Sequence, residues 1–150
     1  MSRPIVALVG RTNVGKSTLL NRLVGARTAV VDDQPNVTRD RVVVPFTRDG
    51  RDMLLVDTGG WAGDASSGLD AKVRKQAELA IQQSDLIVLV VDAHDGVIAA
   101  DEEVAELVRA ADKRSMLVVN KVDTEYHEAA ATDFYQLGIT PVVTLSAYHN

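Results

Sequence analysis

Short apolar runs of strand length recur along this chain, separated by longer segments in which apolar and polar positions alternate. The run at 5–9 reads Ile-Val-Ala-Leu-Val, without a polar residue, as is typical of a strand buried on both faces. Runs of this kind, bounded by polar or turn-forming residues, predict six strands. The predicted strands are 5–9, 41–46, 53–56, 86–91, 116–119 and 141–145.

Between most of these runs, apolar residues recur at helical spacing. The segment 129–137 predicts a further helix with the same character. Strands that alternate with helices predict an α/β fold, with a mostly parallel six-stranded sheet and helices on both faces. The three clearest apolar helix faces are Leu19, Leu20, Leu23 and Val24, then Val73, Ala77, Ala80 and Ile81, then Val104, Leu107, Val108 and Ala111.

One connection breaks the alternation. The strands at 41–46 and 53–56 are separated only by 47–52, which contains Gly50, so we expect an antiparallel hairpin at the edge of the sheet. After residue 145 no further segment of helical period follows. We therefore expect the sheet to lack a final helix on one face, and residues 1–150 to be one domain of a longer multidomain protein.

The composition of the chain limits the cellular location and the kinds of partner that we expect for this domain. The chain has no cysteine, so neither a disulfide nor a thiolate metal site can form, and a reducing cytoplasmic location is the simplest interpretation. The formal net charge of −5 argues against a broad basic surface for nucleic acid. The N-terminus does not resemble a signal peptide and no apolar run is long enough to span a membrane, so we expect no membrane association.

The first strand leads into Gly-Arg-Thr-Asn-Val-Gly-Lys-Ser at 10–17, which fits the phosphate-binding pattern G-x-x-x-x-G-K-[ST]. A strand that feeds a glycine-rich turn and a helix directs backbone N–H groups and the helix N-terminus at one point. Lys16 would contact the outer phosphates and the Ser17 hydroxyl would bind Mg²⁺. A glycine turn without a ligand is the simpler alternative. The predicted phosphate contacts are Gly10, Arg11, Thr12, Asn13, Val14, Gly15, Lys16, Ser17 and Thr18.

Asp57 follows the third predicted strand and begins Asp-Thr-Gly-Gly, a match to D-x-x-G. Its carboxylate suits Mg²⁺, and the N–H of Gly60 would sense a terminal phosphate. A plain Asp and Gly turn after a strand is the alternative. The preceding segment 27–41 has the composition of a mobile loop, and there Thr38 is the candidate hydroxyl ligand to Mg²⁺ when a γ-phosphate is present. The motif adds Asp57, Thr58, Gly59, Gly60 and Trp61 to the predicted phosphate site.

A third motif, Asn-Lys-Val-Asp at 120–123, matches N-K-x-D. The Asp123 carboxylate can accept two hydrogen bonds from the N1–H and the N2 amino group of guanine, whereas adenine offers neither donor. Asn120 would tie loops together, and the stem of Lys121 would lie along the base. A solvated charge pair between Lys121 and Asp123 is the alternative. The predicted guanine contacts are Asn120, Lys121, Val122, Asp123, Ser146, Ala147 and Tyr148.

Taken in order, these motifs resemble the translation-factor-class GTPases and, more closely, the first GTPase domain of the bacterial ribosome-assembly GTPases of the Der (EngA) family. The resemblance rests on G-R-T-N-V-G-K-S-T-L-L-N-R-L, P-N-V-T-R-D-R, D-T-G-G-W, N-K-V-D and S-A-Y-H. Two residues depart from the family pattern: Thr12 replaces a usual proline and Asn36 a usual glycine. Full-length members add a second GTPase domain and an RNA-contacting domain, and the resemblance implies that the large ribosomal subunit and its RNA are partners.

The resemblance also bears on hydrolysis. Trp61 occupies the place where many GTPases carry a water-orienting glutamine, so hydrolysis is expected to be slow or assisted by another group, unless Trp61 is only a core anchor. Asn13 is a candidate ligand for K⁺ by analogy with potassium-stimulated GTPases, with a purely local loop role as the alternative. The scattered histidines His94, His127 and His149 show no metal-ligand spacing, and we expect them to be surface or packed residues.

The sequence therefore predicts a Mg²⁺-dependent domain that binds GTP and GDP and hydrolyses GTP slowly. Lys16, Thr38 and Gly60 would stabilise the transferring phosphate, with Ser17, Thr38 and Asp57 at Mg²⁺ and Asn13 at K⁺. The first alternative is a GTP-gated binding module with negligible hydrolysis of its own. The second is an ATPase of the same fold, against which Asp123 argues.

Overall fold

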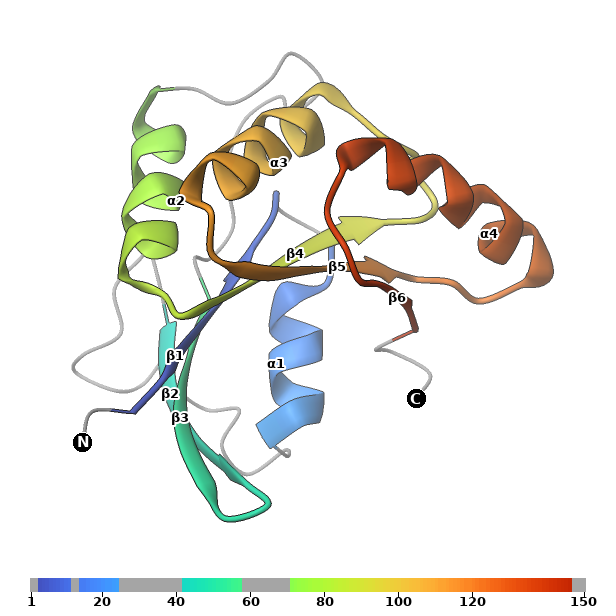
Figure 1. The fold of residues 1–150 in the computed structure, drawn as a ribbon. Helices are drawn as coiled ribbons and strands as arrows, with labels where there is room; N and C mark the ends of the chain where they lie inside the picture. Colours follow the sequence, from blue (N-terminus) through green and yellow to red (C-terminus); the bar gives the residue numbers. More distant parts are fainter. Residues whose placement is uncertain (1–2, 12–13, 25–41, 58–70, 147–150) are drawn as a thin grey trace.

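The computed structural model describes residues 3–11, 14–24, 42–57 and 71–146. Within these residues, six strands form a sheet in the order β2-β3-β1-β4-β5-β6 (Figure 1). Neighbouring strands run parallel except β2 and β3, which are antiparallel, so the predicted mostly parallel sheet with an antiparallel edge hairpin is confirmed. The strands are β1 Ile5–Val9, β2 Val42–Arg48, β3 Arg51–Asp57, β4 Leu86–Asp92, β5 Arg114–Asn120 and β6 Val142–Thr144.

The turn of the edge hairpin is shorter than the segment 47–52 that the sequence suggested. β2 and β3 remain paired as far as Arg48 and Arg51, so only Asp49 and Gly50 form the turn. Both turn residues have positive φ, 53° and 77°. This is the conformation that an Asp-Gly pair adopts in a two-residue hairpin whose twist matches that of its strands.

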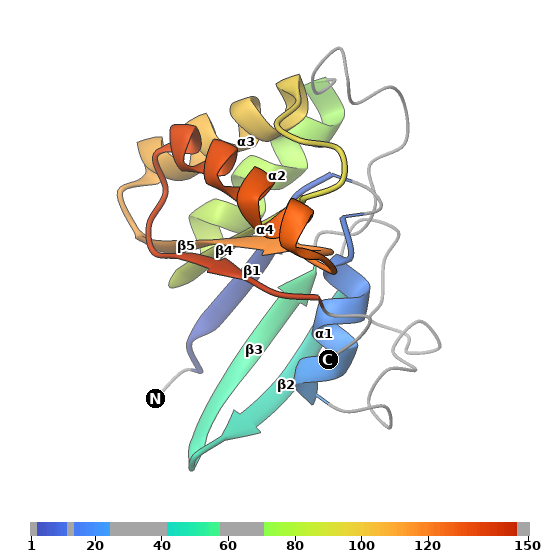
Figure 2. The same ribbon diagram turned by 90° about the vertical axis from the view of Figure 1, so that its right-hand side faces the viewer.

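The described helices are distributed over both faces of the sheet, as predicted. α2, α3 and α4 lie on one face and α1 lies on the other, an arrangement that Figure 2 shows from the side. A hydrophobic core that includes Leu89 and Phe134 lies between the first face and its helices. A second core, which includes Leu8 and Leu20, lies between the other face and α1. The helices are α1 Lys16–Val24, α2 Ala71–Gln83, α3 Ala99–Ala111, α4 Glu125–Ala130 and the 3-10 helix η3 Ala131–Leu137.

The fourth helix differs from the predicted segment 129–137. It begins earlier, because the Thr124 hydroxyl accepts a hydrogen bond from the N–H of His127 and so caps α4. After Ala130 the chain tightens into η3, which ends at Gly138 in the left-handed conformation. The apolar residues of the predicted helix, Phe134 and Leu137, are buried against the sheet as its period implied.

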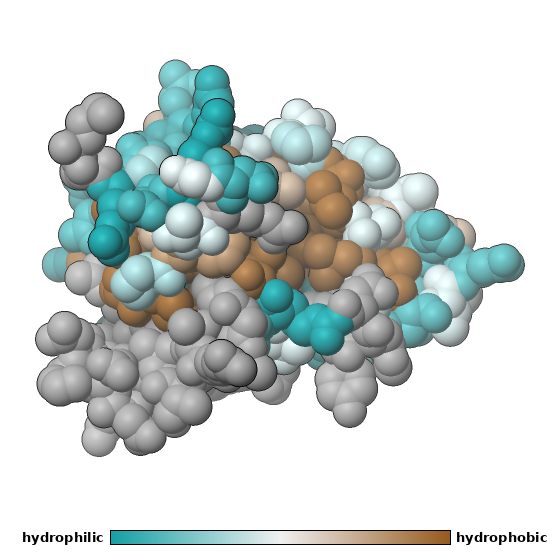
Figure 3. Space-filling view, turned by 90° about the horizontal axis from the view of Figure 1, so that it is seen from below, coloured by the Kyte–Doolittle hydropathy of each residue, from teal (hydrophilic) through white to brown (hydrophobic). Residues whose placement is uncertain are grey.

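The face of the sheet that α1 covers carries apolar surface beyond that helix. Figure 3 views the molecule from this side and shows apolar residues at the surface. Leu86, Met116 and Leu145 are only partly buried there, and Val143 of β6 is exposed. Among the described helices α1 alone lies on this face. No described helix combines the length and apolar character needed to cross a membrane.

The parallel strands bring the predicted motifs to one edge of the sheet. Gly10 follows β1, Asp57 ends β3, Asp92 ends β4, Asn120 ends β5 and Ser146 follows β6. All five residues therefore lie at the carboxyl ends of parallel strands, which is where ligands bind in open α/β sheets.

Candidate nucleotide-binding site

The two glycines of the phosphate loop occupy positions that no other residue would fit. Gly10 has φ of 147°, and a Cβ there would lie 2.5 Å from the carbonyl oxygen of Val90. Gly15 has φ of 96°, and a Cβ there would lie 2.2 Å from Nδ2 of Asn120. Both a left-handed backbone and a close approach therefore require glycine at these positions. This packing is specific to the predicted motif and goes beyond what a simple turn needs.

Lys16 folds back over this loop. Its side chain is only 5% exposed, and Nζ donates hydrogen bonds of 2.6 Å to the carbonyl of Gly10 and 2.9 Å to that of Arg11. Burial lowers the pKa of Lys16 from its usual 10.5 to about 8, while the nearby Asp57 carboxylate acts to raise it and Arg11 to lower it. Burial destabilises the charged ammonium of Lys16, and an anion bound beside it would offset that cost. The position therefore favours the binding of an anion.

Asp57 is the second buried charge at this edge. It is 2% exposed at the end of β3, and its charge acts on Lys16. A buried carboxylate beside the lysine predicted to bind phosphate fits the predicted role of Asp57 in holding Mg²⁺, which prefers oxygen ligands and keeps several waters. The backbone of Ser17 lies in the first turn of α1, as the motif requires.

The side chain of Arg11 turns away from this loop towards the segment between β4 and α3. Nη2 lies 2.5 Å from Oδ2 of Asp95, and Nε lies 3.7 Å from Oδ1 of Asp101. Asp101 also accepts a hydrogen bond from the N–H of Ile98 at the start of α3. Burial raises the pKa of Asp101 from its usual 3.8 to about 6, although that hydrogen bond and Arg11 both oppose the change. The phosphate-loop motif predicts only a phosphate contact for Arg11, so the sequence does not predict this ion pair with Asp95.

The N-K-x-D motif is tied to the phosphate loop. Asn120 is 2% exposed, and Nδ2 donates a hydrogen bond of 2.9 Å to the carbonyl of Val14. Lys121 follows with φ of 66°, and Nζ lies 2.9 Å from Oδ2 of Asp92. The expected link between loops is thus present. Lys121 forms an ion pair with Asp92 at the end of β4.

Asp123 presents its carboxylate beside the end of β6. The hydroxyl of Ser146 donates a hydrogen bond of 2.6 Å to Oδ1 of Asp123, and the N–H of Val122 donates one of 3.0 Å to the carbonyl of Leu145. These contacts bring together the two predicted guanine segments, which are far apart in sequence. They border a pocket lined by Val122, Asp123, Thr124, Glu125, Glu128, Thr144, Leu145 and Ser146.

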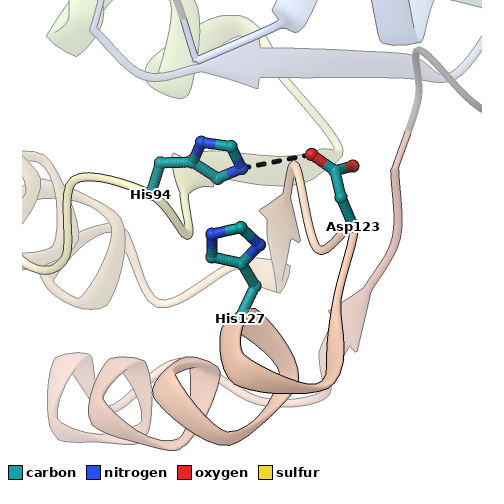
Figure 4. Close-up of side chains that lie close together, drawn as sticks. All are labelled: His94, Asp123 and His127. Atoms are coloured by element: carbon teal, nitrogen blue, oxygen red, sulfur yellow. Dashed lines mark hydrogen bonds and ion pairs between the residues drawn. The ribbon is translucent and has the colours of Figure 1, made fainter.

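Two histidines lie beside Asp123, where the sequence predicted only surface or packed residues. Nε2 of His94 lies 3.1 Å from Oδ2 of Asp123, and the ring of His94 stacks on that of His127 with centroids 4.0 Å apart (Figure 4). A signal was present in the sequence. His127 is four residues after Asp123, and His94 follows β4, the strand next to β5.

Several predicted site residues lie outside the described part of the chain. For Ser17 only the backbone is described. The roles assigned to these residues stay predictions. The residues outside are Thr12, Asn13, Thr38, Thr58, Gly59, Gly60, Trp61, Ala147 and Tyr148.

Residues 5–121 match the family described as 50S ribosome-binding GTPase. The chain belongs to this family. It is 53% identical over 147 residues to GTPase Der of Desulforamulus reducens, covering 98% of this chain and 33% of that protein. It is 49% identical over 145 residues to GTPase Der of Syntrophotalea carbinolica, covering 97% and 33%. The chain thus spans about a third of the length of these relatives, and the predicted resemblance to the first GTPase domain of Der is confirmed.

Solved structures of GTPases share the fold. Era of Aquifex aeolicus, in a variant bound to GDP and AlF4⁻, matches with a TM-score of 0.75 and 28% identity over 98% of this chain and 52% of that one. The G domain of the FeoB iron transporter of T. maritima matches with a TM-score of 0.68 and 28% identity over 98% and 89%. The predicted P-loop GTPase fold is therefore confirmed.

Proposed function

We propose that this domain binds GTP and GDP with Mg²⁺ and hydrolyses GTP slowly, as a conformational switch. The observation that carries the proposal is the arrangement of Asp123. Its carboxylate is oriented by Ser146 and its motif is joined through Asn120 to the phosphate loop. A guanine site and a phosphate site are thereby held in one rigid frame.

The charges support one orientation of the nucleotide. Glu125 and Glu128 line the pocket beside Asp123 and would repel phosphate. Lys16, at the other end of the frame, supplies the buried positive charge. The base therefore belongs at Asp123 and the phosphates at Lys16. Asp123 would accept two hydrogen bonds from guanine, and adenine lacks the matching donors.

Ser17, Thr38 and Asp57 are the residues that would hold Mg²⁺. When bound, the ion would neutralise charge on the phosphate oxygens. Lys16 would bind the outer phosphates, and Thr38 and Gly60 would help to stabilise the transferring group. With tryptophan at position 61, no side chain of the sequence is an obvious water-orienting group, which supports slow hydrolysis. We also propose that Asn13 binds K⁺ at the phosphate loop.

A GTP-gated binding module without hydrolysis of its own is the second candidate function. Trp61, in place of the usual glutamine, is the observation that favours it. Single-turnover hydrolysis of GTP by the 150-residue chain separates the two candidates. Conversion of the bound GTP to GDP supports the enzyme, whereas stable GTP over hours supports the module.

The wider role rests on the family. The description of the family and the GTPase Der relatives support a cytoplasmic role in assembly of the large ribosomal subunit. The length of those relatives supports further domains in the same protein, through which ribosomal RNA would be contacted. In this proposal residues 1–150 form the GTPase domain of a longer multidomain protein.

The substitution Asp123→Asn tests guanine selection. GDP affinity is expected to fall by about 10²- to 10⁴-fold, because two hydrogen bonds to a charged group contribute about 1.5–3 kcal/mol each. Xanthosine diphosphate is expected to bind better, since the amide can donate to the C2 carbonyl. Fluorescence titrations with labelled GDP, XDP and ADP measure these affinities.

The matched control is Asp133→Asn, which removes an exposed carboxylate from η3 and is expected to leave GDP affinity unchanged. Equal affinity of the parent for ADP and GDP, or unchanged GDP affinity in Asp123→Asn, contradicts the proposal.

A further inference from the structure

Three potential metal ligands converge beside the guanine motif. His94 comes from the segment after β4, Asp123 from the segment after β5, and His127 from α4 (Figure 4). One ligand atom of each lies within 4.8 Å of the others. The family motif accounts for Asp123 but gives no role to either histidine.

We propose that His94, Asp123 and His127 form a binding site for one borderline divalent cation, with Zn²⁺ as the best match. Imidazole nitrogens and a carboxylate oxygen are the ligands that Zn²⁺ takes, commonly two histidines and one carboxylate with a further position open to water. Mg²⁺ and Ca²⁺ favour sites made of oxygen alone. The presence of two imidazoles therefore selects a transition metal over the ions expected at the phosphates.

The surroundings of the three residues suit such a site. Ser146 donates to Oδ1 of Asp123, which leaves Oδ2 directed at His94. Thr124 Oγ1 lies 3.1 Å from Nδ1 of His127, so a hydroxyl is placed to orient this ring. The carboxylates of Glu125 and Glu128 near Asp123 add negative potential that favours a cation.

The ligand atoms can contract around an ion. Zinc bonds to nitrogen and oxygen are about 2.0–2.2 Å long, so ligand atoms in a tetrahedral site lie roughly 3.3 Å apart. The His94–Asp123 contact of 3.1 Å already matches this spacing. The rings of His94 and His127 are stacked at 14°, so their in-plane lone pairs do not converge until the rings turn apart to share an ion. The His94 side chain is 43% exposed and that of Asp123 is 27% exposed, so both side chains have room to turn.

Occupation of this site would exclude the guanine base. This part of the inference rests on the proposed function, in which guanine uses both oxygens of Asp123. A metal at Oδ2 would remove one of the two acceptors and hold His94 over the carboxylate. Zinc and guanine nucleotide would then compete, and by linkage each would weaken the other by the same factor.

The first experiment measures metal binding alone. Zn²⁺ is titrated into the nucleotide-free 150-residue chain by calorimetry, with Mg²⁺ as the comparison ion. One zinc per chain is expected. His94→Gln and His127→Ala are each expected to weaken it by at least about 10-fold, which is the loss that even outer-shell partners cause. Gln at position 94 can still donate to Asp123, so its effect distinguishes a metal ligand from a hydrogen-bonding partner.

His149→Ala and Asp133→Asn serve as matched controls, because they remove a histidine and a carboxylate that the site does not use. Both are expected to retain the affinity of the parent for zinc. Circular dichroism of every variant shows that the fold is kept. The metal site is overturned by the absence of stoichiometric zinc binding, or by full affinity in His94→Gln and His127→Ala. Neither result affects the proposed function, which needs no zinc.

The second experiment measures competition. Labelled GDP is titrated in excess Mg²⁺, with and without Zn²⁺, for the parent and for His127→Ala. Zinc is expected to raise the apparent Kd for GDP in the parent, and a zinc concentration about 10-fold higher or more should be needed for the same effect in the variant. An equal effect in both proteins would place zinc at the phosphates and overturn the exclusion. Failure of GDP to bind in the absence of zinc would instead contradict the proposed function.

Discussion

The side-chain amide of Asn120 donates a hydrogen bond of 2.9 Å to the backbone carbonyl of Val14, across 106 positions of sequence. Asn120 ends β5 and Val14 follows β1, and these two strands are not neighbours in the sheet because β4 lies between them. Asn120 and Val14 are both buried, so water does not readily replace this bond. It couples the loop that carries Asp123 to the loop that carries Lys16.

Gly15→Ala is expected to break this coupling. The new Cβ would lie 2.2 Å from Nδ2 of Asn120, so the amide must move away from Val14. Loss of the buried hydrogen bond is expected to lower the free energy of unfolding by about 1–3 kcal/mol beyond the cost of backbone strain. GDP affinity should fall as well. Urea denaturation and GDP titration measure the two effects.

Gly50→Ala is the matched control. Gly50 also has positive φ, 77°, but a Cβ there meets no atom within 4 Å. This substitution therefore introduces strain without a clash, and GDP affinity should remain that of the parent. An equal decrease in the free energy of unfolding in both variants would show that the contact with Asn120 does not contribute to stability.

The free energy of unfolding of the nucleotide-free domain is expected to rise with pH through the titration of Lys16. Folding lowers the pKa of this lysine from 10.5 to about 8. The folded state is therefore penalised for the charged form in full below about pH 8, and the penalty disappears as pH rises towards 10.5. The gain is on the order of 3 kcal/mol at about 1.4 kcal/mol per unit of pKa. Urea denaturation between pH 7 and pH 10 measures it.

Lys16→Met isolates this contribution. The variant has no group to titrate at this position, so its stability should rise less with pH than that of the parent. It should also remain folded, since the proposed role of Lys16 is to bind phosphate. Parallel pH profiles for parent and variant would contradict the prediction, and an unfolded variant would show that Lys16 is mainly structural.

Much of the fold could be predicted from periodicity. β1 matches its predicted bounds because an uninterrupted apolar run is the signature of a parallel strand buried on both faces. β5 begins at Arg114, two residues before the apolar run, because backbone pairing with β4 extends to polar residues at the strand end. The start of α4 depended on a cap at Thr124, which periodicity does not register.

In the candidate site, too, some features could be predicted from the sequence and others could not. Residues within a motif, such as Lys16 and Asp123, could be selected from the sequence because motif spacing alone marks them as candidate phosphate and guanine contacts. Contacts between motifs depended on strand order. The Arg11–Asp95 pair and the His94–Asp123 pair both use the segment after β4, which carries no recognised motif. Only the position of β4 between β1 and β5 brings that segment to the site.

Lys113→Met is expected to destabilise the domain away from the site. Nζ of Lys113 donates hydrogen bonds to the carbonyls of Ile81, Gln82 and Ser84. It thereby provides partners for carbonyl groups at the C-terminal end of α2, where the helix itself offers no donor. Loss of these charged hydrogen bonds is expected to lower the free energy of unfolding by about 1.5–3 kcal/mol. Lys75→Met, at an exposed position of α2, is the control and should have little effect. Thermal and urea denaturation of the two variants at pH 7 provide the comparison.

Hydrolysis of GTP is expected to be faster in KCl than in NaCl at equal ionic strength. Trp61 offers no amide to orient water, and no arginine is placed by the sequence as a built-in source of charge, so the transition state needs another cation. Asn13, within the phosphate loop, has a side-chain carbonyl able to ligate a monovalent ion. Single-turnover hydrolysis by the parent and by Asn13→Ala, in both salts, tests this assignment.

The two roles considered for Asn13 lead to different patterns in that experiment. If Asn13 binds K⁺, the variant loses the stimulation by potassium and keeps its affinity for GDP, because the ion acts on charge that develops between the phosphates only during hydrolysis. If Asn13 only stabilises its loop through local backbone hydrogen bonds, the variant loses GDP affinity and rate in both salts alike. Equal rates of the parent in KCl and NaCl would rule out a potassium site, whatever the variant does.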